Sequence, residues 1–269
     1  MRAISSAFVS LFYLWSNLAQ GGDLGSAQLR ARPAKPSRQA QIGVHPLGLG
    51  TGRDGLISVP PGYKPGQRVP LIVMLHGARG PESAAQFCAD AAKEGIAVLM
   101  PDSRAKNWDL ITSGRFGPDI EFLDRALQKT FASLAVDPQR IALAGFSDGA
   151  SYALSVGLAN GDLFSHAIAY SPGFLRASVF HGRPSIFVAH GSDDQVLSII
   201  PTRQIVAKLK AAGYRVEFTE FRGGHGIARD VTRKSFRWLA GRVGPAVSKP
   251  SQDVPLFESQ PIQDQSGGL

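Results

Sequence analysis

The sequence predicts an α/β fold in which a mostly parallel, twisted β-sheet is covered by helices on both faces. Short apolar runs alternate along the chain with helical patterns, and this alternation is typical of a parallel sheet covered by helices. The chain has 269 residues, of which 43% are hydrophobic and 19% are charged, so it can bury a full-sized core. We expect one such domain over residues 42–243.

The predicted strands are the short apolar runs, such as LIVML at residues 71–75. In chain order they cover residues 56–59, 71–75, 96–100, 141–145, 167–170, 185–189 and 216–221. The segments between them with helical patterns are predicted as helices, at residues 83–93, 118–132, 150–158, 200–212 and 227–240. Ligands of open parallel sheets bind at the carboxyl ends of the strands, so the polar residues that follow strands are the functional candidates.

The two ends of the chain differ from this pattern. Arg2 is followed by an apolar stretch over residues 3–18, whose length suits a secretory signal peptide better than a membrane span. We therefore expect residues 1–27 to be a signal peptide of a secreted or periplasmic protein, the alternative being a frayed extension. Residues 28–41 mix basic residues, Ser and Pro and are predicted as a linker, and residues 244–269 as a disordered tail.

Charge and cysteine content exclude several classes of protein. The net charge is +8, and five basic residues against one acidic residue in the first forty positions account for half of it. The body carries no Lys/Arg run, zinc-knuckle or helix-turn-helix pattern, so we expect no nucleic-acid partner. Cys88 is the single cysteine, which excludes an intramolecular disulfide framework and a cysteine-based metal cage.

A candidate nucleophile follows the predicted strand IALAG. The chain there reads Gly145-Phe146-Ser147-Asp148-Gly149 and continues into a predicted helix, which is the strand-turn-helix context of the G-x-S-x-G pattern. On so tight a turn, side chains two positions before and after the serine would collide with neighbouring elements, and glycine avoids this. The bare pattern is weak evidence, because a chain this rich in Gly and Ser produces it by chance in about a third of random orders.

A second turn supports this interpretation. His76-Gly77-Ala78-Arg79-Gly80 follows the predicted strand LIVML and so ends at the same edge of the sheet. The backbone N–H groups of Ala78 and Asp148 could together bind the negative oxygen of a tetrahedral intermediate. The alternative is an ordinary strand-end turn that uses glycine for its backbone conformation.

A serine hydroxyl also needs a base, and the base needs a carboxylate that orients it. The sequence offers Ser147, then Asp194 after one strand, then His225 after another, in the chain order of α/β-hydrolases. Asp194 is preferred as the acid because it lies one residue deeper in its loop, and Asp193 is the alternative. We expect His76 and His190 to be structural. No H-x-x-x-H spacing accompanies the histidines, so no metal or other cofactor is predicted.

These motifs resemble those of α/β-hydrolase fold serine esterases, in particular the phospholipase/carboxylesterase-like and poly(hydroxyalkanoate)-depolymerase or feruloyl-esterase-like branch. The matching segments are VPPGYKPGQRVPLIVMLHGARG, VLMPDSRAKNWDL, GPDIEFLDRAL, VDPQRIALAGFSDGASYAL, HGSDDQV and GGHGI. The resemblance implies that Ser147 is the nucleophile, Asp194 the acid and His225 the base, with Ala78 and Asp148 as backbone donors. Gln195 stands where such proteins often carry Pro, which leaves the acid loop less constrained.

Substrate contacts are predicted on the loops at the same edge. Residues 172–184 are too short for a cap domain, so the site should be open. Trp108, Phe116 and Phe174 could line a substrate slot, the alternative being that they cap the core. Arg79 could attract an acidic ester, although charged loop residues are usually only solvated.

The sequence therefore predicts an enzyme, a serine hydrolase of carboxylic esters that acts through an acyl-enzyme on a small or polymeric ester. A polyester depolymerase and a feruloyl-type esterase are the enzymatic alternatives. A non-catalytic binding protein on the same scaffold is the alternative outside enzymes. The ester's acyl and alcohol parts and the oligomeric state stay open.

Overall fold

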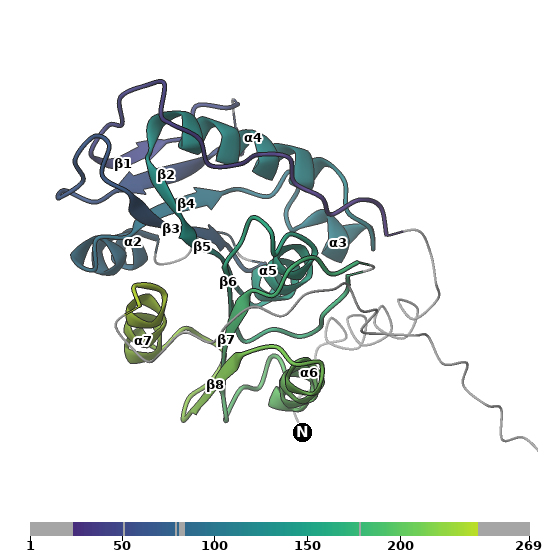
Figure 1. The fold of residues 1–269 in the computed structure, drawn as a ribbon. Coiled ribbons are helices and arrows are strands. Elements are labelled where there is room, and N and C mark those ends of the chain that lie inside the picture. The colour runs from purple at the N-terminus through teal and green to yellow at the C-terminus, as the bar shows by residue number, and fades with distance from the viewer. Residues whose placement is uncertain (1–23, 51, 79, 81–83, 178, 242–269) are drawn as a thin grey trace, which may run out of the picture.

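The computed structural model describes residues 24–241 except 51, 79, 81–83 and 178. In the described residues one sheet has the strand order β1-β2-β4-β3-β5-β6-β7-β8 (Figure 1). The strands are β1 (Gly43–Pro46), β2 (Gly55–Val59), β3 (Val69–Leu75), β4 (Ala97–Pro101), β5 (Val136–Phe146), β6 (His166–Tyr170), β7 (Ser185–Gly191) and β8 (Val216–Phe221). The β1–β2 and β2–β4 pairs are antiparallel and the remaining pairs are parallel, which confirms the predicted, mostly parallel sheet.

Helices cover both faces of this sheet, as predicted. They are α2 (Ala84–Lys93), α3 (Asp109–Thr112), α4 (Pro118–Ser133), α5 (Asp148–Ala159), α6 (Ile199–Ala211) and α7 (Arg229–Leu239). Buried residues of α2 and α7 pack together on one face, whereas those of α4 and α5 pack on the other. Each predicted strand and helix is present, and of the elements in the described residues only the short β1 and α3 were not predicted.

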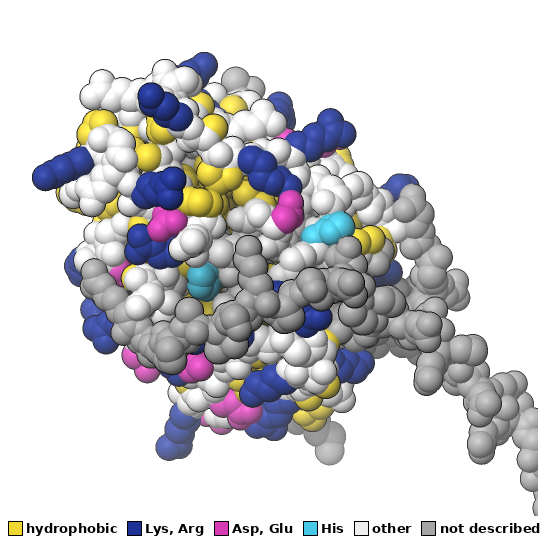
Figure 2. Space-filling view, viewed as in Figure 1, with side chains coloured by type: hydrophobic (Ala, Val, Ile, Leu, Met, Phe, Trp, Pro, Cys, Tyr) yellow, Lys and Arg dark blue, Asp and Glu magenta, His cyan; other side chains and the backbone are white. Residues whose placement is uncertain are grey.

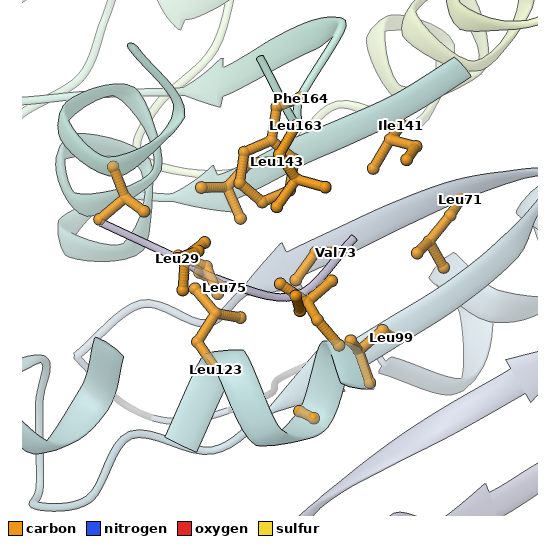
Figure 3. Packing of buried hydrophobic residues seen from close by; sticks show 14 of the residues in the cluster. Leu29, Leu71, Val73, Leu75, Leu99, Leu123, Ile141, Leu143, Leu163 and Phe164 are labelled. Atoms are coloured by element: carbon orange, nitrogen blue, oxygen red, sulfur yellow. The ribbon is translucent and has the colours of Figure 1, made fainter. Parts of the chain in front are cut away.

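Successive side chains of β3 point to opposite faces of the sheet, so this strand contributes to the cores on both faces. Leu71, Val73 and Leu75 join the core beneath α4 and α5 (Figure 3), whereas Ile72 and Met74 join the core beneath α2 and α7. A strand buried on both faces reads as a continuous apolar run, and this is why LIVML was recognisable. Its carboxyl end is thereby held firmly beside that of β5.

Residues 24–42 pack on the domain although they contain no helix or strand. Leu29 and Ala31 are buried, and the Leu29 N–H donates to Asn160 Oδ1 at 2.8 Å. Asp124 Oδ1 accepts the N–H groups of Arg30 and Ala31, each at 2.7 Å. The part of the predicted linker that precedes residue 32 is therefore anchored on α4 and α5. Most of the predicted signal peptide and the predicted tail lie outside the described residues.

Two further features concern the surface and the loops. Among the described helices, none has the length and apolar character needed to cross a membrane. Lys and Arg side chains are spread over the viewed face, with Asp and Glu between them (Figure 2). The described residues between β6 and β7 contain no helix, so this connection inserts no helical cap over the sheet edge.

Candidate active site

Ser147 lies on the tight turn between β5 and α5. Its backbone has φ 55° and ψ −119°, in the left-handed region that residues other than glycine rarely occupy. Such a conformation costs about 1–3 kcal/mol and persists where surrounding contacts enforce it. Here the Ser147 N–H donates to Tyr170 O at 2.9 Å, and its carbonyl accepts the N–H of Ala150. The turn leaves the hydroxyl at the carboxyl edge of the sheet.

The two glycines that flank this serine are required by close backbone contacts. A Cβ atom on Gly145 would lie 2.1 Å from Gly149 O, and one on Gly149 would lie 2.4 Å from His76 O. Neither distance is possible for a real side chain, because the atoms they would meet belong to the backbone. The G-x-S-x-G spacing is therefore a packing requirement of this turn, and it brings α5 against the end of β3.

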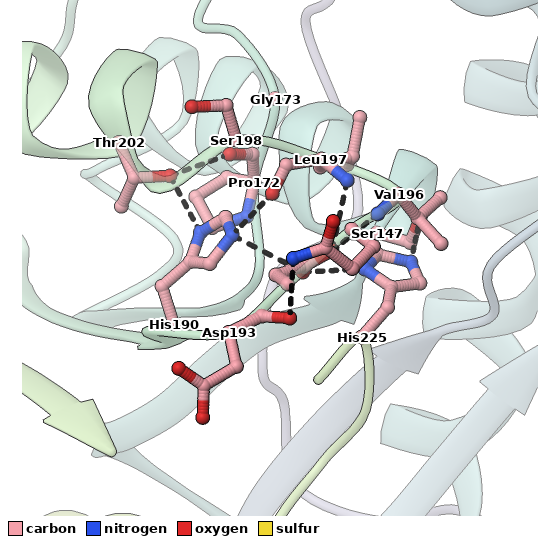
Figure 4. A network of polar contacts seen from close by, with 12 residues as sticks. Ser147, Pro172, Gly173, His190, Asp193, Val196, Leu197, Ser198, Thr202 and His225 are labelled. Atoms are coloured by element: carbon pink, nitrogen blue, oxygen red, sulfur yellow. Dashed lines mark hydrogen bonds and ion pairs between the residues drawn. The ribbon is translucent and has the colours of Figure 1, made fainter. Parts of the chain in front are cut away.

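Ser147, His225 and Asp194 form a continuous chain of hydrogen bonds. His225 Nε2 lies 2.9 Å from Ser147 Oγ, and His225 Nδ1 lies 2.7 Å from Asp194 Oδ2 (Figure 4). Since the carboxylate is an acceptor, Nδ1 donates to it and Nε2 is left to accept the serine proton. The arrangement can therefore move a proton from the hydroxyl to the imidazole while the carboxylate stabilises the cation that results.

The loops after β7 and β8 bring these groups together. The N–H of Asp193 donates to Gly223 O at 2.9 Å, and that of Ser192 donates to Phe221 O at 2.8 Å. Gly191 allows this contact, because a Cβ there would lie 2.4 Å from Gly223 O. The acid loop and the histidine loop thus lie directly against one another.

The two candidate acids differ sharply in their surroundings. The Asp194 side chain is fully buried, and its Oδ1 accepts the N–H groups of Val196 and Leu197 at 2.9 Å each. Burial by itself raises the pKa of Asp194, but these N–H groups and His225 outweigh it, so the pKa lies below the ordinary value. Asp193 is exposed, and its carboxylate points away from His225 (Figure 4). The geometry places Asp194, not Asp193, beside the imidazole.

Both predicted backbone donors lie at this edge. Asp148 is the first residue of α5, where N–H groups have no acceptor within the helix. Ala78 is exposed in the turn that follows β3, and this turn is closed by a bond from Gly80 N–H to Gly77 O at 3.1 Å. A Cβ on Gly77 would lie 3.4 Å from Ser147 Cβ, which shows how near the two turns are.

The residues predicted to contact substrate have other places in the structure. Trp108 and Phe116 are 1% and 4% exposed and belong to the core, so the prediction that they line an open slot is wrong. Their rings pack on Tyr152, and Trp108 Nε1 donates to His76 O at 2.8 Å. They cap the core and support the turn after β3. Phe174 is half-buried at the edge, and Arg79 lies outside the described residues.

Two residues that contact the site were not predicted from the sequence. Phe146 stacks on His225 with ring centroids 4.8 Å apart, and Asn107 Nδ2 donates to Asp148 Oδ2 at 2.6 Å. Phe146 is the variable position inside G-x-S-x-G, and Asn107 lies in a polar loop, so neither carried a signal of its own. In the part of the chain that the structure describes, no cluster of three or more His, Cys, Asp or Glu side chains could hold a metal ion.

The Esterase family model, described as "Putative esterase", matches residues 48–201 of this chain. No curated protein sequence matches this chain. Esterase PE8 is 20% identical with a TM-score of 0.58, and the match covers 70% of this chain and 98% of that one. S-formylglutathione hydrolase from Staphylococcus aureus is 12% identical with a TM-score of 0.60, covering 76% and 99%. The fluorophosphonate-binding serine hydrolase F of the same organism is 13% identical with a TM-score of 0.56, covering 70% and 92%. These likenesses show the α/β-hydrolase fold.

Proposed function

Since this chain belongs to the Esterase family, we propose that it is a serine hydrolase that cleaves carboxylic esters through an acyl-enzyme. One observation carries the proposal, namely that His225 bridges Ser147 Oγ at 2.9 Å and the buried carboxylate of Asp194 at 2.7 Å. A serine hydroxyl is a weak nucleophile at neutral pH, and this bridge supplies the base and the acid that activate it.

In the first half of the reaction, Ser147 Oγ attacks the carbonyl carbon of the ester while His225 Nε2 takes the hydroxyl proton. The tetrahedral intermediate then breaks its bond to the alcohol oxygen, and His225 returns the proton to the leaving alcohol. The acyl group remains on Ser147 as an ester. Asp194 stays ionised throughout and stabilises the His225 imidazolium that forms in between.

Water completes the reaction. A water molecule gives a proton to His225 Nε2 and attacks the acyl carbon, and Ser147 leaves as His225 returns that proton to Oγ. In both halves the carbonyl oxygen becomes negative, and the N–H groups of Ala78 and Asp148 are the proposed donors to it. Loss of one such donor typically costs about 10²–10³ in rate.

The surroundings of the site favour esters that reach it from solution or from an exposed surface. The described residues between β6 and β7 carry no helix that would cover the sheet edge. Ser147 itself is 8% exposed, and the side chain of His225 is 16% exposed. The proton-transfer pair is thus partly sheltered but still reaches the surface.

Ser147→Ala tests the function. With a series of p-nitrophenyl esters of increasing acyl length, we expect the wild type to turn over the shorter members and Ser147→Ala to lose at least about 10³-fold in kcat/KM. Ser192→Ala, at an exposed serine on the acid loop, is the matched control and should keep wild-type rates. Equal hydrolysis by wild type and Ser147→Ala would remove the proposal.

A further inference from the structure

His190 is a fully buried histidine at the end of β7 that the mechanism above does not use. Its Nε2 lies 2.9 Å from Leu197 O and 3.2 Å from Asp194 Oδ2. Its Nδ1 lies 2.8 Å from Thr202 Oγ1 (Figure 4). The carboxylate of Asp194 is therefore contacted by two imidazoles, those of His190 and His225.

The partners of Nε2 decide which way its hydrogen bonds run. A peptide carbonyl can only accept, so Nε2 carries a hydrogen and donates it to Leu197 O, while Asp194 Oδ2 lies at ion-pair distance from the same nitrogen. On the other side of the ring, the Thr202 hydroxyl donates to Pro172 O at 2.7 Å. The same Thr202 oxygen, Oγ1, lies 2.8 Å from Nδ1, so Thr202 bridges the ring to Pro172.

His190 also lies against the carboxylate of Asp194. Oδ1 accepts the N–H groups of Val196 and Leu197, and Oδ2 accepts the N–H of His225 Nδ1. His190 Nε2 lies 3.2 Å from Oδ2 and donates to Leu197 O, the carbonyl of a residue whose own N–H holds Oδ1. The imidazole of His190 therefore packs beside the carboxylate in the orientation in which Oδ2 faces His225.

The same histidine also ties the acid loop to the rest of the site. Gln195 stands in this loop where a proline would stiffen the backbone, and its exposed side chain makes only a 3.3 Å bond to Asp193 O. His190 instead holds the loop from the buried side through Leu197 O.

Beyond the loop, the Thr202 hydroxyl links His190 to Pro172. The next residue, Gly173, donates its N–H to Ser151 Oγ on α5 at 2.9 Å. Since α5 begins directly after Ser147, these contacts run from the acid to the nucleophile's helix.

We propose that His190 is a positioning residue whose Nε2–H holds the acid loop through Leu197 O and, from its place beside Oδ2, keeps the Asp194 carboxylate toward His225. This inference rests on the proposed function for its kinetic consequence, but not for its structural one. Removal of Nε2–H should let the carboxylate and its loop shift. A misplacement of about 1 Å in such a group can cost about 10²-fold in rate.

Two amide substitutions at position 190 distinguish the role of Nε2 from that of Nδ1. The side-chain amide of Gln reaches about as far as Nε2, whereas that of Asn reaches only as far as Nδ1. We expect His190→Asn to lower kcat by about 10- to 100-fold with little change in KM, because the substrate does not touch His190. We expect His190→Gln to keep kcat within about 3-fold of the wild type. Both variants bury an amide, so a general packing defect would affect them alike.

A spectroscopic readout tests the inference independently of activity. The proton shared by His225 Nδ1 and Asp194 should give a low-field ¹H resonance, assigned by its loss in His225→Ala. We expect this resonance to stay in place in His190→Gln and to move or broaden in His190→Asn. If the wild type hydrolyses no ester, the proposed function fails while this comparison still decides the role of His190.

Specific results would overturn the inference. Wild-type kcat and an unchanged low-field resonance in His190→Asn would do so, as would equal losses in His190→Asn and His190→Gln. If neither variant folds, Thr202→Val and Thr202→Ser replace them. Loss of the hydroxyl in Thr202→Val should move the resonance relative to Thr202→Ser, and identical spectra of those two variants would count against the proposal.

Discussion

Asp193 and Asp194 are neighbours in the sequence, yet only one of them is buried and bonded to an imidazole. We expect Asp194→Asn to lower kcat by about 10⁴-fold, because His225 would lose the carboxylate that holds its tautomer and stabilises its charged form. Asp193→Asn should change kcat less than about 2-fold, because its side chain is exposed and makes no contact with His225. Steady-state kinetics of the two variants check this, and similar losses in both would contradict the assignment.

At the scale of single residues, the sequence predicted which side chains meet but not what surrounds them. Ser147, Asp194 and His225 were recognisable because each follows a strand within a glycine-containing turn. The burial of Trp108 was not, because a loop aromatic packs inward or outward according to tertiary neighbours such as Tyr152. The contact of Phe146 with His225 likewise depends on two segments far apart in the chain.

The loop between β4 and α4 is held by two buried aspartates. Asp109 Oδ2 accepts the N–H groups of Gly117 and Asp119 at 2.9 Å each, and Asp119 Oδ1 accepts the N–H of Arg104. The Tyr152 hydroxyl donates to Asp109 Oδ1 at 3.0 Å. The same loop carries Asn107, which donates to the residue after the nucleophile. The carboxylates of Asp109 and Asp119 therefore hold the loop from which Asn107 contacts Asp148 at the site.

This loop should make stability depend on pH. Burial raises the pKa of Asp119 to about 6 from its ordinary 3.8, and the charge of Asp109 adds to the effect. Between these two values the folded protein binds more protons than the unfolded chain, so this group's contribution to the free energy of unfolding falls as pH rises from about 4 to about 6. The variant Asp119→Asn lacks this titrating carboxyl group.

Urea unfolding of wild type and Asp119→Asn at several pH values isolates this contribution. We expect the unfolding free energy of the wild type minus that of the variant to decrease from about pH 4 to about pH 6 and then to level off. Subtraction of the variant removes the titration of the other carboxylates. A difference that stays constant or increases over this range would contradict the raised pKa of Asp119.

Helices and strands could be predicted from the sequence where their burial produces a recognisable pattern of apolar residues. β5 begins at Val136, five residues before its predicted start. Its first part was not predicted because it is polar and contains Pro138. β1 is an edge strand whose Val44 is 55% exposed, so no apolar run marks it. α3 has a single turn, which is too short to show helical periodicity.

The packed N-terminal segment gives a prediction for the whole molecule. Leu29 is 2% exposed within the core cluster that also contains residues of α4 and α5. Leu29→Ala should lower the free energy of unfolding by about 2–5 kcal/mol through lost burial and the cavity left behind. Arg30→Ala, at the exposed neighbouring side chain, is the control and should stay within about 0.5 kcal/mol of the wild type.

Chemical denaturation of the purified protein measures both changes. A Leu29→Ala protein as stable as the Arg30→Ala protein would mean that residues 24–38 are a loose connection rather than part of the domain. The sequence could not distinguish these cases, because Leu29 is an isolated apolar residue in a segment of basic residues, Ser and Pro.

The parallel order β5-β6-β7-β8 explains how three distant residues come together. All these strands end at one edge, so the turns after β5, β7 and β8 deliver Ser147, Asp194 and His225 to the same place. This part of the architecture could be predicted from the sequence, because strand-helix alternation implies parallel strands. The exact distances could not, because they depend on loop contacts such as that of Asp193 with Gly223.

The contact with His225 should make the hydroxyl of Ser147 more reactive than that of any other serine in the folded protein. Treatment of the folded protein with a fluorophosphonate, followed by mass spectrometry of its peptides, measures this reactivity at every serine at once. We expect one stoichiometric adduct, on the peptide that contains Ser147, and none in Ser147→Ala or after prior unfolding. A folded protein that stays unlabelled, or that carries its adduct on another serine, would contradict it.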